Sequence, residues 1–335
     1  MDKRSKKNTS VDVARLAGVS QTTVSRAFNT PDSVNEETLQ RILNAAKQLN
    51  YTPNIFAKNL VSHQTNLIGV IVKDFENPFY TSFVSQISQK LSAIGKKILL
   101  FSGTDQKTIL DILNEADSFQ VNGLIIASAL LSEQLTEQNI PTKIPVVMIN
   151  RQTSSKYYCS VASDDIESGR YVADFFISKG FHSFAFITGP KTHQSSIRRQ
   201  QGYINRLAEW GYYNVNILNG EYTYNSGYYA MQKLISLKPI LPIGVLCAND
   251  LMALGAIDAI KQCGQYRIPT DFSLIGFDDI SEGTWKSYQL STMQLPITQM
   301  INTAFEYLNS YYISPGTLSG KHLFPCKLIE RKTTF

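Results

Sequence analysis

The feature that most constrains the fold is two successive series of short apolar segments, each alternating with helix-like amphipathic segments. The first series lies at residues 67–72, 97–101, 122–127 and 145–149, and the second at 183–187, 214–218, 242–247 and 272–276. This alternation is typical of βαβ units, in which parallel strands form a sheet that helices cover on both faces. Two such series predict an α/β body of two doubly wound parallel-sheet lobes over residues 67–335.

The chain has to pass between the two predicted lobes, and we place these crossovers near residues 161–163 and 290–293. A last helix, at about 297–312, and a last strand, at about 323–329, are assigned mainly to the first lobe and the joint. The first lobe then comprises about 67–161 and 293–322. The second comprises about 162–291 and 323–335.

Residues 1–50, called the head, predict a small all-α domain. Thr9 followed by Asp12 is a variant of the capping box, and it starts a helix with Val13, Leu16 and Ala17 on its inner side. Ser20 caps a second helix at 21–29. A third helix begins at Asn35, and its apolar residues recur at helical spacing; they are Leu39, Ile42, Leu43, Ala46 and Leu49.

The first two helices have the spacing of a helix-turn-helix. Ala14 is small where two helices cross, Gly18 fits a tight turn, and Val24 is a β-branched core residue. The second helix then presents Gln21, Thr22 and Arg26 outward, and such side chains read base edges in a major groove. An ordinary three-helix bundle with a polar face is the alternative explanation of the same pattern.

Charge is concentrated in the N-terminal part of the chain. Residues 1–63 hold nine Lys and Arg against five Asp and Glu, a net charge of +4, while the whole chain carries +5. This asymmetry favours a head that meets a polyanion and a body that does not. A solvated basic tail would give the same count.

These segments resemble the LacI/GalR (lactose repressor) family over essentially the whole chain. The head carries the resemblance in VDVARLAGVSQTTVSRAFN, VNEETLQRILNAAKQLNYTPN and AKNL, and the body carries it in IGVIVKDFENPFY, PVVMINR, SDDIESGR, ITGP, AND and IGFDD. The resemblance implies a DNA-binding transcription regulator, with repression the expected sense. Its effector domain would resemble periplasmic sugar-binding proteins.

The resemblance also implies which side chains meet DNA. Gln21, Thr22 and Arg26 take the base-reading positions, with Ser20, Thr23, Ser25 and Asn29 near them and mostly facing phosphate. A hinge helix and linker lie at 51–66, where Asn54 fits a helix start, Ala57 permits close helix approach and Leu60 takes the position of a minor-groove wedge. A helix this short is marginal alone. Plain linker packing is the alternative role of Leu60.

In the body, the resemblance implies an effector site at the carboxyl ends of the strands, between the lobes. The residues are planar polar groups and rings, which suit a polyhydroxylated ligand: Asn77, Phe79, Tyr80, Asn150, Arg151, Arg199, Tyr222, Asn249, Asp278 and Gln294. Asn150 stands where ribose-type sugar binders usually carry Asp. A phosphorylated or nucleoside-like ligand is the alternative to a sugar. Asn249 and Asp278 are equally explained as residues that hold loops.

We therefore expect a cytoplasmic homodimer that binds a near-palindromic operator and is controlled by a small ligand, with no cofactor and no metal. The chain has no GxSxG, Walker loop, GxGxxG or HExxH motif, so no enzyme activity is expected. Its four cysteines form no CxxC pair and are expected to serve packing. No apolar run is long enough to span a membrane. The rival interpretations are a binding protein or enzyme with an incidental helical head, and a regulator controlled by a protein partner.

Overall fold

The structure is a computed structural model that describes residues 8–52, 65–72, 75–102, 109–127, 144–152, 157–313 and 319–335. The chain divides into two compact units, Met1–Thr65 and Asn66–Phe335.

The first unit contains the three predicted helices of the head. They are α1 (Ser10–Ala17), α2 (Gln21–Asn29) and α3 (Glu36–Gln48), with a short 3-10 turn at Pro31–Ser33. Thr9 and Asp12 form a capping box at α1, and Ser20 accepts from the backbone N–H of Thr23 at the start of α2. Gly18 ends α1 in the left-handed region at φ 65°, a conformation that favours glycine.

The core of the head differs in two positions from the expected one. Val13, Ala14, Ala17, Val24 and Ile42 are buried, whereas Leu16 is 51% exposed and Leu43 is 39% exposed. Neighbouring Ala14 and Ala45 take the inward positions instead. Small side chains there let three short helices approach closely, so the longer leucines lie outside the apolar stripe.

The second unit contains two six-stranded sheets. The first has the order β11-β5-β4-β3-β1-β2 and is parallel throughout. Its strands are β1 (Leu67–Val72), β2 (Lys97–Ser102), β3 (Leu124–Ala127), β4 (Val146–Ile149), β5 (Cys159–Ser163) and β11 (Gly320–Phe324).

The second sheet has the order β12-β10-β9-β8-β6-β7. Its strands are β6 (Ser183–Ile187), β7 (Val215–Leu218), β8 (Ile243–Cys247), β9 (Phe272–Asp278), β10 (Ser291–Gln294) and β12 (Lys327–Ile329). All neighbours are parallel except β10 and β12. The two lobes thus share one strand order. In each lobe the first strand along the chain, β1 or β6, pairs with the second strand on one side and with the third strand on the other.

The predicted lobe boundaries each fall inside a strand. The crossover at 161/162 lies within β5, the return near 292 lies within β10, and the break at 322/323 lies within β11. The expected last strand at 323–329 is two strands, β11 in the first sheet and β12 in the second. A short apolar run does not indicate which sheet it joins, so the sequence pattern placed these lobe boundaries inside strands.

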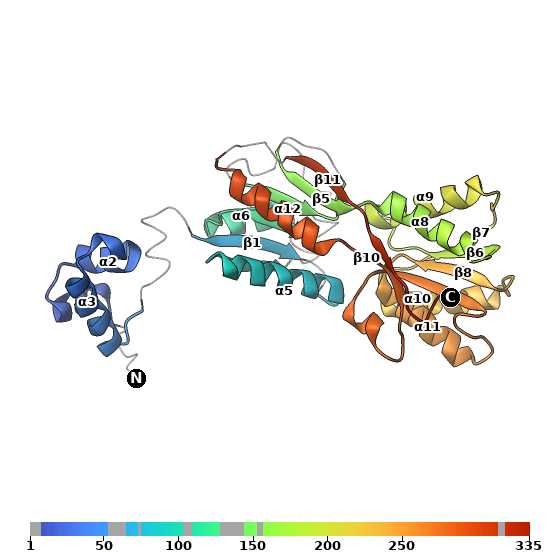
Figure 1. Ribbon diagram of the computed structural model, residues 1–335, viewed down its shortest axis with the longest axis horizontal. Coiled ribbons are helices and arrows are strands. Elements are labelled where there is room, and N and C mark those ends of the chain that lie inside the picture. The colour runs from blue at the N-terminus through green and yellow to red at the C-terminus, as the bar shows by residue number, and fades with distance from the viewer. Residues whose placement is uncertain are drawn as a thin grey trace. The chain divides into compact units, whose positions relative to one another are not determined.

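Helices cover both faces of each sheet (Figure 1). In the first lobe, α5 (Pro78–Ala93) and α12 (Ile297–Ser310) pack on one face and α6 (Ile109–Ser118) on the other. In the second lobe, α8 (Asp165–Ser178) pairs with α9 (Gln194–Glu209), and α10 (Tyr224–Ser236) pairs with α11 (Asp250–Cys263). Figure 1 shows these two pairs on opposite faces of the second sheet.

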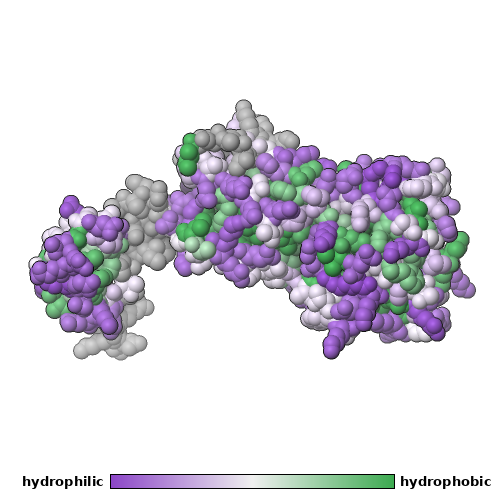
Figure 2. Space-filling view, in the orientation of Figure 1, coloured by the Kyte–Doolittle hydropathy of each residue, from purple (hydrophilic) through white to green (hydrophobic). Residues whose placement is uncertain are grey.

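The visible surface of the body is mainly hydrophilic, with hydrophobic side chains in scattered patches (Figure 2). Among the described residues, no helix combines the length and apolar character that crossing a membrane requires.

Glycines allow the paired helices of the second lobe to touch through their backbones. A Cβ added at Gly202 on α9 would lie 2.0 Å from the carbonyl oxygen of Ile166 on α8, and one at Gly169 on α8 would lie 2.3 Å from that of Arg199. Neither contact leaves room for a methyl group, because both neighbours are backbone atoms. The position of α9, and therefore of Arg199, depends on this close approach.

Replacing Gly202 with Ala should force α8 and α9 apart. We expect Gly202→Ala to lower the free energy of unfolding by roughly 1–3 kcal/mol, the usual effect of overpacking a tight interior. Urea unfolding of the full-length protein measures this change. Gln201→Ala, at an exposed position of the same helix, is the matched control and should stay within about 0.5 kcal/mol of wild type. Equal stability of G202A and Q201A would contradict the close-packing argument.

Candidate functional site

The head carries an exposed polar face on α2. Gln21, Thr22 and Arg26 are all exposed, as the sequence predicts, and among the described residues no hydrogen bond or ion pair engages the Arg26 guanidinium. The amide nitrogen Nε2 of Gln21 donates to Ser10 Oγ at 3.0 Å. Gln21 thus has its amide held from α1, while Arg26 projects one turn further along the same helix.

The flanking polar residues are partly used by the head itself. Ser20 Oγ and Thr23 Oγ1 lie 2.8 Å apart at the start of α2, and Asn29 Nδ2 donates to Ser25 Oγ at 3.2 Å. These hydroxyls therefore stabilise the helix and remain at the surface, in keeping with a supporting role beside the base-reading positions. Asn54, Ala57 and Leu60 of the expected hinge lie outside the described residues.

In the body, Arg199 is the centre of a buried polar cluster. Its Nε donates to Asp165 Oδ1 at 2.9 Å and its Nη1 donates to the carbonyl oxygen of Ala248 at 2.7 Å. Asp278 Oδ1 lies 3.9 Å from the same Nη1. Asp165 follows β5 of the first sheet, while Ala248 and Asp278 stand at the carboxyl ends of β8 and β9 of the second. Arg199 therefore connects the start of α8, just after β5, with the carboxyl edge of the second sheet.

Burial and charge act against each other in this cluster. Arg199 is 3% exposed and its guanidinium lies 3.6 Å over the ring of Phe277. Burial alone lowers the pKa of Arg199, but the carboxylates of Asp165 and Asp278 and the nearby Tyr222 outweigh that effect, so the pKa is raised. Burial raises the pKa of the Asp278 carboxyl well above its usual value, and Arg199 opposes this rise. Arg199 thus remains charged, and its charge limits the rise in the pKa of the Asp278 carboxyl.

Among the described residues, three buried polar atoms have no hydrogen-bond partner: Asn150 Oδ1, Arg151 Nη1 and Arg198 Nε. Asn150 directly follows β4, where its backbone is in the left-handed region at φ 57°. Gln152 Nε2, one residue after Arg151, donates to the carbonyl of Ser163 at 2.7 Å and reaches Asp165 Oδ2 at 3.4 Å. Arg198 acts electrostatically on Asp165 as well. Gln152, beside Arg151, and Arg198 thus both act on the Asp165 carboxylate, the first from the segment after β4 and the second from α9.

The start of α5 joins the two lobes. Asn77 is buried and caps α5 by accepting from the N–H of Phe79 at 3.0 Å. Phe79 packs with the core of the second lobe, and Tyr80 contacts the cores of both. Asn77 and Phe79 thus stabilise the start of α5 and its contact with the second lobe. Of these three residues, only Tyr80 is partly exposed.

Three further predicted residues hold loops. Asn249 caps α11 through Met252 N–H at 3.0 Å and donates to the carbonyl of Tyr222 at 3.1 Å. Tyr222 packs against Gly189, where a Cβ would meet its ring at 2.4 Å, and its hydroxyl lies 3.1 Å from Ser195 Oγ. Gln294 is exposed and donates to Asp279 Oδ2 at 2.7 Å.

Two residues of this cluster were not among the predicted site residues. Asp165 is the direct partner of Arg199, and Arg198 carries one of the unpartnered donors. A signal for both was present: Asp165 lies in the segment SDDIESGR directly after a strand, and Arg198 adjoins Arg199 in a run of two arginines. The sequence alone does not show which arginine of the pair is neutralised.

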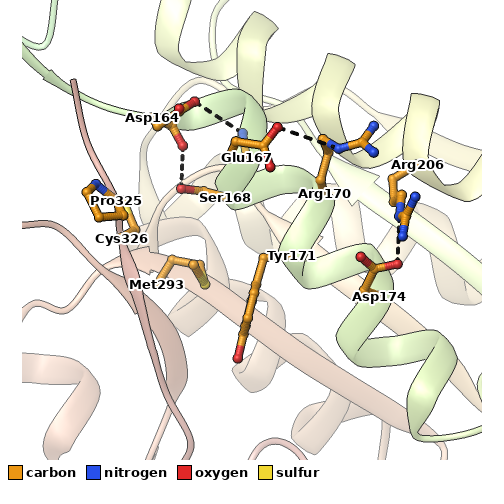
Figure 3. A pocket seen from close by; sticks show the side chains of 10 residues that line it. All are labelled: Asp164, Glu167, Ser168, Arg170, Tyr171, Asp174, Arg206, Met293, Pro325 and Cys326. Carbon is orange, nitrogen blue, oxygen red and sulfur yellow. Dashed lines mark hydrogen bonds and ion pairs between the residues drawn. The ribbon is translucent and has the colours of Figure 1, made fainter.

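A separate pocket of about 340 Å³ lies along the outer side of α8. It is lined by Asp164, Glu167, Ser168, Arg170, Tyr171, Asp174, Arg206, Met293, Pro325 and Cys326 (Figure 3). Its two arginines already have carboxylate partners: Arg170 pairs with Glu209 at 2.7 Å and Arg206 with Asp174 at 2.7 Å. Both arginines of this pocket are therefore already paired with carboxylates.

Cys159 and Cys326 are poor nucleophiles and metal ligands. Burial raises the pKa of the Cys159 thiol to about 12, and it raises the pKa of Cys326 to about 12 also. Among the described residues, no group of three or more His, Cys, Asp and Glu side chains is placed to hold a metal ion.

A capped helix-turn-helix head and a body of two repeated α/β lobes with a polar cluster at their carboxyl edges define a ligand-responsive DNA-binding regulator. Residues 10–54 match the family model for bacterial regulatory proteins of the lacI family, and residues 173–334 match a periplasmic binding protein-like domain. The chain is 33% identical to the probable HTH-type transcriptional repressor ExuR of Bacillus subtilis over 93% of this chain and 94% of that protein. It belongs to the LacI family of transcription regulators.

Solved structures agree with this assignment. A crystal structure of the lac repressor dimer bound to operator and the anti-inducer ONPF superposes with a TM-score of 0.86 at 25% identity, covering 98% of this chain and 99% of that one. The complex of the transcriptional regulator CelR with cellobiose has a TM-score of 0.66 at 26% identity and covers 97% and 99%. The fold prediction of an all-α head and a two-lobed α/β body is confirmed.

Removing Arg199 should leave two buried carboxylates without a counter-charge. We expect Arg199→Met to lower the free energy of unfolding by about 3–5 kcal/mol near neutral pH. Burial raises the pKa of the Asp165 and Asp278 carboxyls in the folded state. Protonation therefore relieves the penalty, and the loss should shrink as the pH is lowered from neutral.

Urea unfolding across this pH range is the measurement. Arg170→Met, which removes a partly exposed arginine from the Glu209 pair, is the control and should cost less than about 1 kcal/mol at every pH. A loss in R199M that matches the control, or that does not change with pH, would show that the buried pair contributes no more than a surface pair.

Proposed function

We propose that this protein is a homodimeric repressor that binds a near-palindromic operator and whose operator affinity is set by a small ligand, a sugar, bound between the two lobes. The observation that carries the proposal is the exposed row Gln21, Thr22 and Arg26 on a helix that is capped at Ser20 and braced from Ser10. A rigid helix with free planar donors is what reading base edges requires.

The DNA-binding residues of the proposal are those of α2, with Ser20, Thr23, Ser25 and Asn29 in supporting positions and Asn54, Ala57 and Leu60 in the hinge. Support for a dimer comes from the lac repressor, whose structure is that of a dimer on its operator. A two-fold dimer places two heads on two half-sites, which is why the operator should be close to palindromic. The protein would act in the cytoplasm, where bacterial DNA lies.

The ligand-binding residues of the proposal are those at the carboxyl edges of both sheets. Doubly wound sheets bind ligands outside the carboxyl ends of strands where the strand order reverses, and Arg199 lies at the carboxyl edge of the second sheet, paired with Asp165 just after β5. Tyr80, Asn150 and Arg151 would contact the ligand directly. Asn77, Phe79, Tyr222, Asn249, Asp278 and Gln294 would shape the site, because hydrogen bonds or packing already engage them. CelR, with cellobiose bound, shows a similar fold that holds a sugar.

The proposal contains no catalytic step and no cofactor. Ligand binding would change how the lobes meet and so how the heads are presented, and the two affinities would then be linked reciprocally. Release of DNA by the ligand is the sense we propose.

Selection of binding sites from bacterial genomic fragments tests the proposal. The full-length wild-type protein should enrich near-palindromic duplexes over random competitor. Arg26→Ala should weaken binding by about 10- to 100-fold and relax the preference at one position of each half-site, because a bidentate base contact contributes about 1–3 kcal/mol.

Arg15→Ala is the matched control, since Arg15 is an exposed arginine of α1 that faces Asp12 at 3.4 Å. Its loss should leave the selected sequence unchanged. An R26A protein that selects the wild-type sequence would exclude Arg26 as a base-reading residue, and a wild-type protein that enriches no duplex at low salt would contradict the proposed function.

A further inference from the structure

The body holds two different sets of arginines, and only one set is neutralised. Arg199 is paired with Asp165 and Asp278 and also donates to Ala248. Arg170 and Arg206 are paired with carboxylates along the outer side of α8, as Figure 3 shows for Arg206 and Asp174. Arg151 and Arg198 belong to neither group, because a buried nitrogen of each has no hydrogen-bond partner.

The position of these two arginines relates them to one site. Arg151 comes two residues after β4 of the first sheet, and its neighbour Gln152 reaches Asp165. Arg198 lies on α9 and acts on the same carboxylate electrostatically. Arg151 thus adjoins a residue that contacts Asp165 from the first lobe, and Arg198 acts on Asp165 from the second lobe.

The charge of this place favours an anion. Asp165 and Asp278 are committed to Arg199, and both lie buried. The third unpartnered atom, Asn150 Oδ1, belongs to a neutral amide. A guanidinium cannot lose its proton near neutral pH, so Arg151 and Arg198 leave positive charge and unused donors that a neutral ligand would not satisfy. Charge-assisted hydrogen bonds to a carboxylate or phosphate would satisfy them.

We infer that the ligand of this body is an acidic sugar: a polyhydroxylated molecule with a carboxylate or phosphate group held between Arg151 and Arg198. The inference rests on the proposed function for the location of the site and deepens it by naming the chemical class of the ligand. Asn150, with both donor and acceptor capacity, would bond a hydroxyl beside the acidic group. The arginines come from different lobes, so the anion would draw the lobes together.

Calorimetry with matched pairs of ligands on the full-length protein tests the inference. Each acid is compared with its neutral parent: D-glucuronate with D-glucose and D-galacturonate with D-galactose for the carboxylate, and ribose 5-phosphate with ribose and glucose 6-phosphate with glucose for the phosphate. At least one acid should bind about tenfold or more tightly than its parent, the usual gain from a charge-assisted contact. The two arms of the panel distinguish carboxylate from phosphate.

Substitution of the arginines then assigns the preference to its residues. Arg151→Gln and Arg198→Gln should each reduce the affinity for the acid by about tenfold or more and leave that for the neutral parent within about twofold. Arg170→Gln, which removes a paired arginine of the same body, should change neither affinity. A melting temperature near that of wild type shows that a variant is folded. If one of the two variants does not fold, the other still tests the contact with the acid.

The outcomes separate this inference from the proposed function. No acid preferred over its parent, or a preference that survives both R151Q and R198Q, overturns the inference. If neutral sugars alone change operator affinity, the inference fails and the proposed function stands. If an acid binds through both arginines and leaves operator affinity unchanged, the anion site stands and the proposed function fails.

Discussion

The buried pair of Arg199 and Asp165 is the interaction on which the rest of the body depends. A guanidinium that is 3% exposed is tolerated only with paired charge and satisfied donors, and here its partners come from three elements: the start of α8, the end of β8 and the end of β9. The same helix, α9, is held against α8 by the glycine contact at Gly202. One side chain thus fixes the start of α8 against the carboxyl ends of two strands of the second sheet.

The head is stabilised by a different principle. Its core consists largely of alanines and β-branched residues, and its helices are fixed by side-chain caps at Thr9, Ser20 and Asn35. Because caps and small-residue packing use few of the polar side chains on α2, the outer face of that helix stays free for DNA. The head therefore presents a fixed polar surface to DNA, and the body contains the polar interior in which we propose that a ligand binds.

Much of this architecture was predictable from local pattern. The capping signatures and Gly18 located the head helices, and the alternation of apolar runs located both sheets. The joint was less predictable, since three crossings occur within a few residues of β5, β10 and β11 and short strands carry no mark of the sheet that they enter. The resemblance included Arg199 among the expected site residues, but its pairing with Asp165 depends on a contact between residues 34 positions apart, which no local pattern shows.

The central claim is that one ligand-binding body governs whether the head remains on DNA, and reciprocal linkage tests it most directly. The dissociation constant of the operator is measured with and without a saturating ligand from the acid and sugar panel, and that of the ligand is measured on the free protein and on the operator complex. The account predicts that the ligand changes the dissociation constant of the operator by some factor different from one, and that the operator changes the dissociation constant of the ligand by the same factor. A ligand that binds the free protein and the operator complex with the same affinity would contradict it.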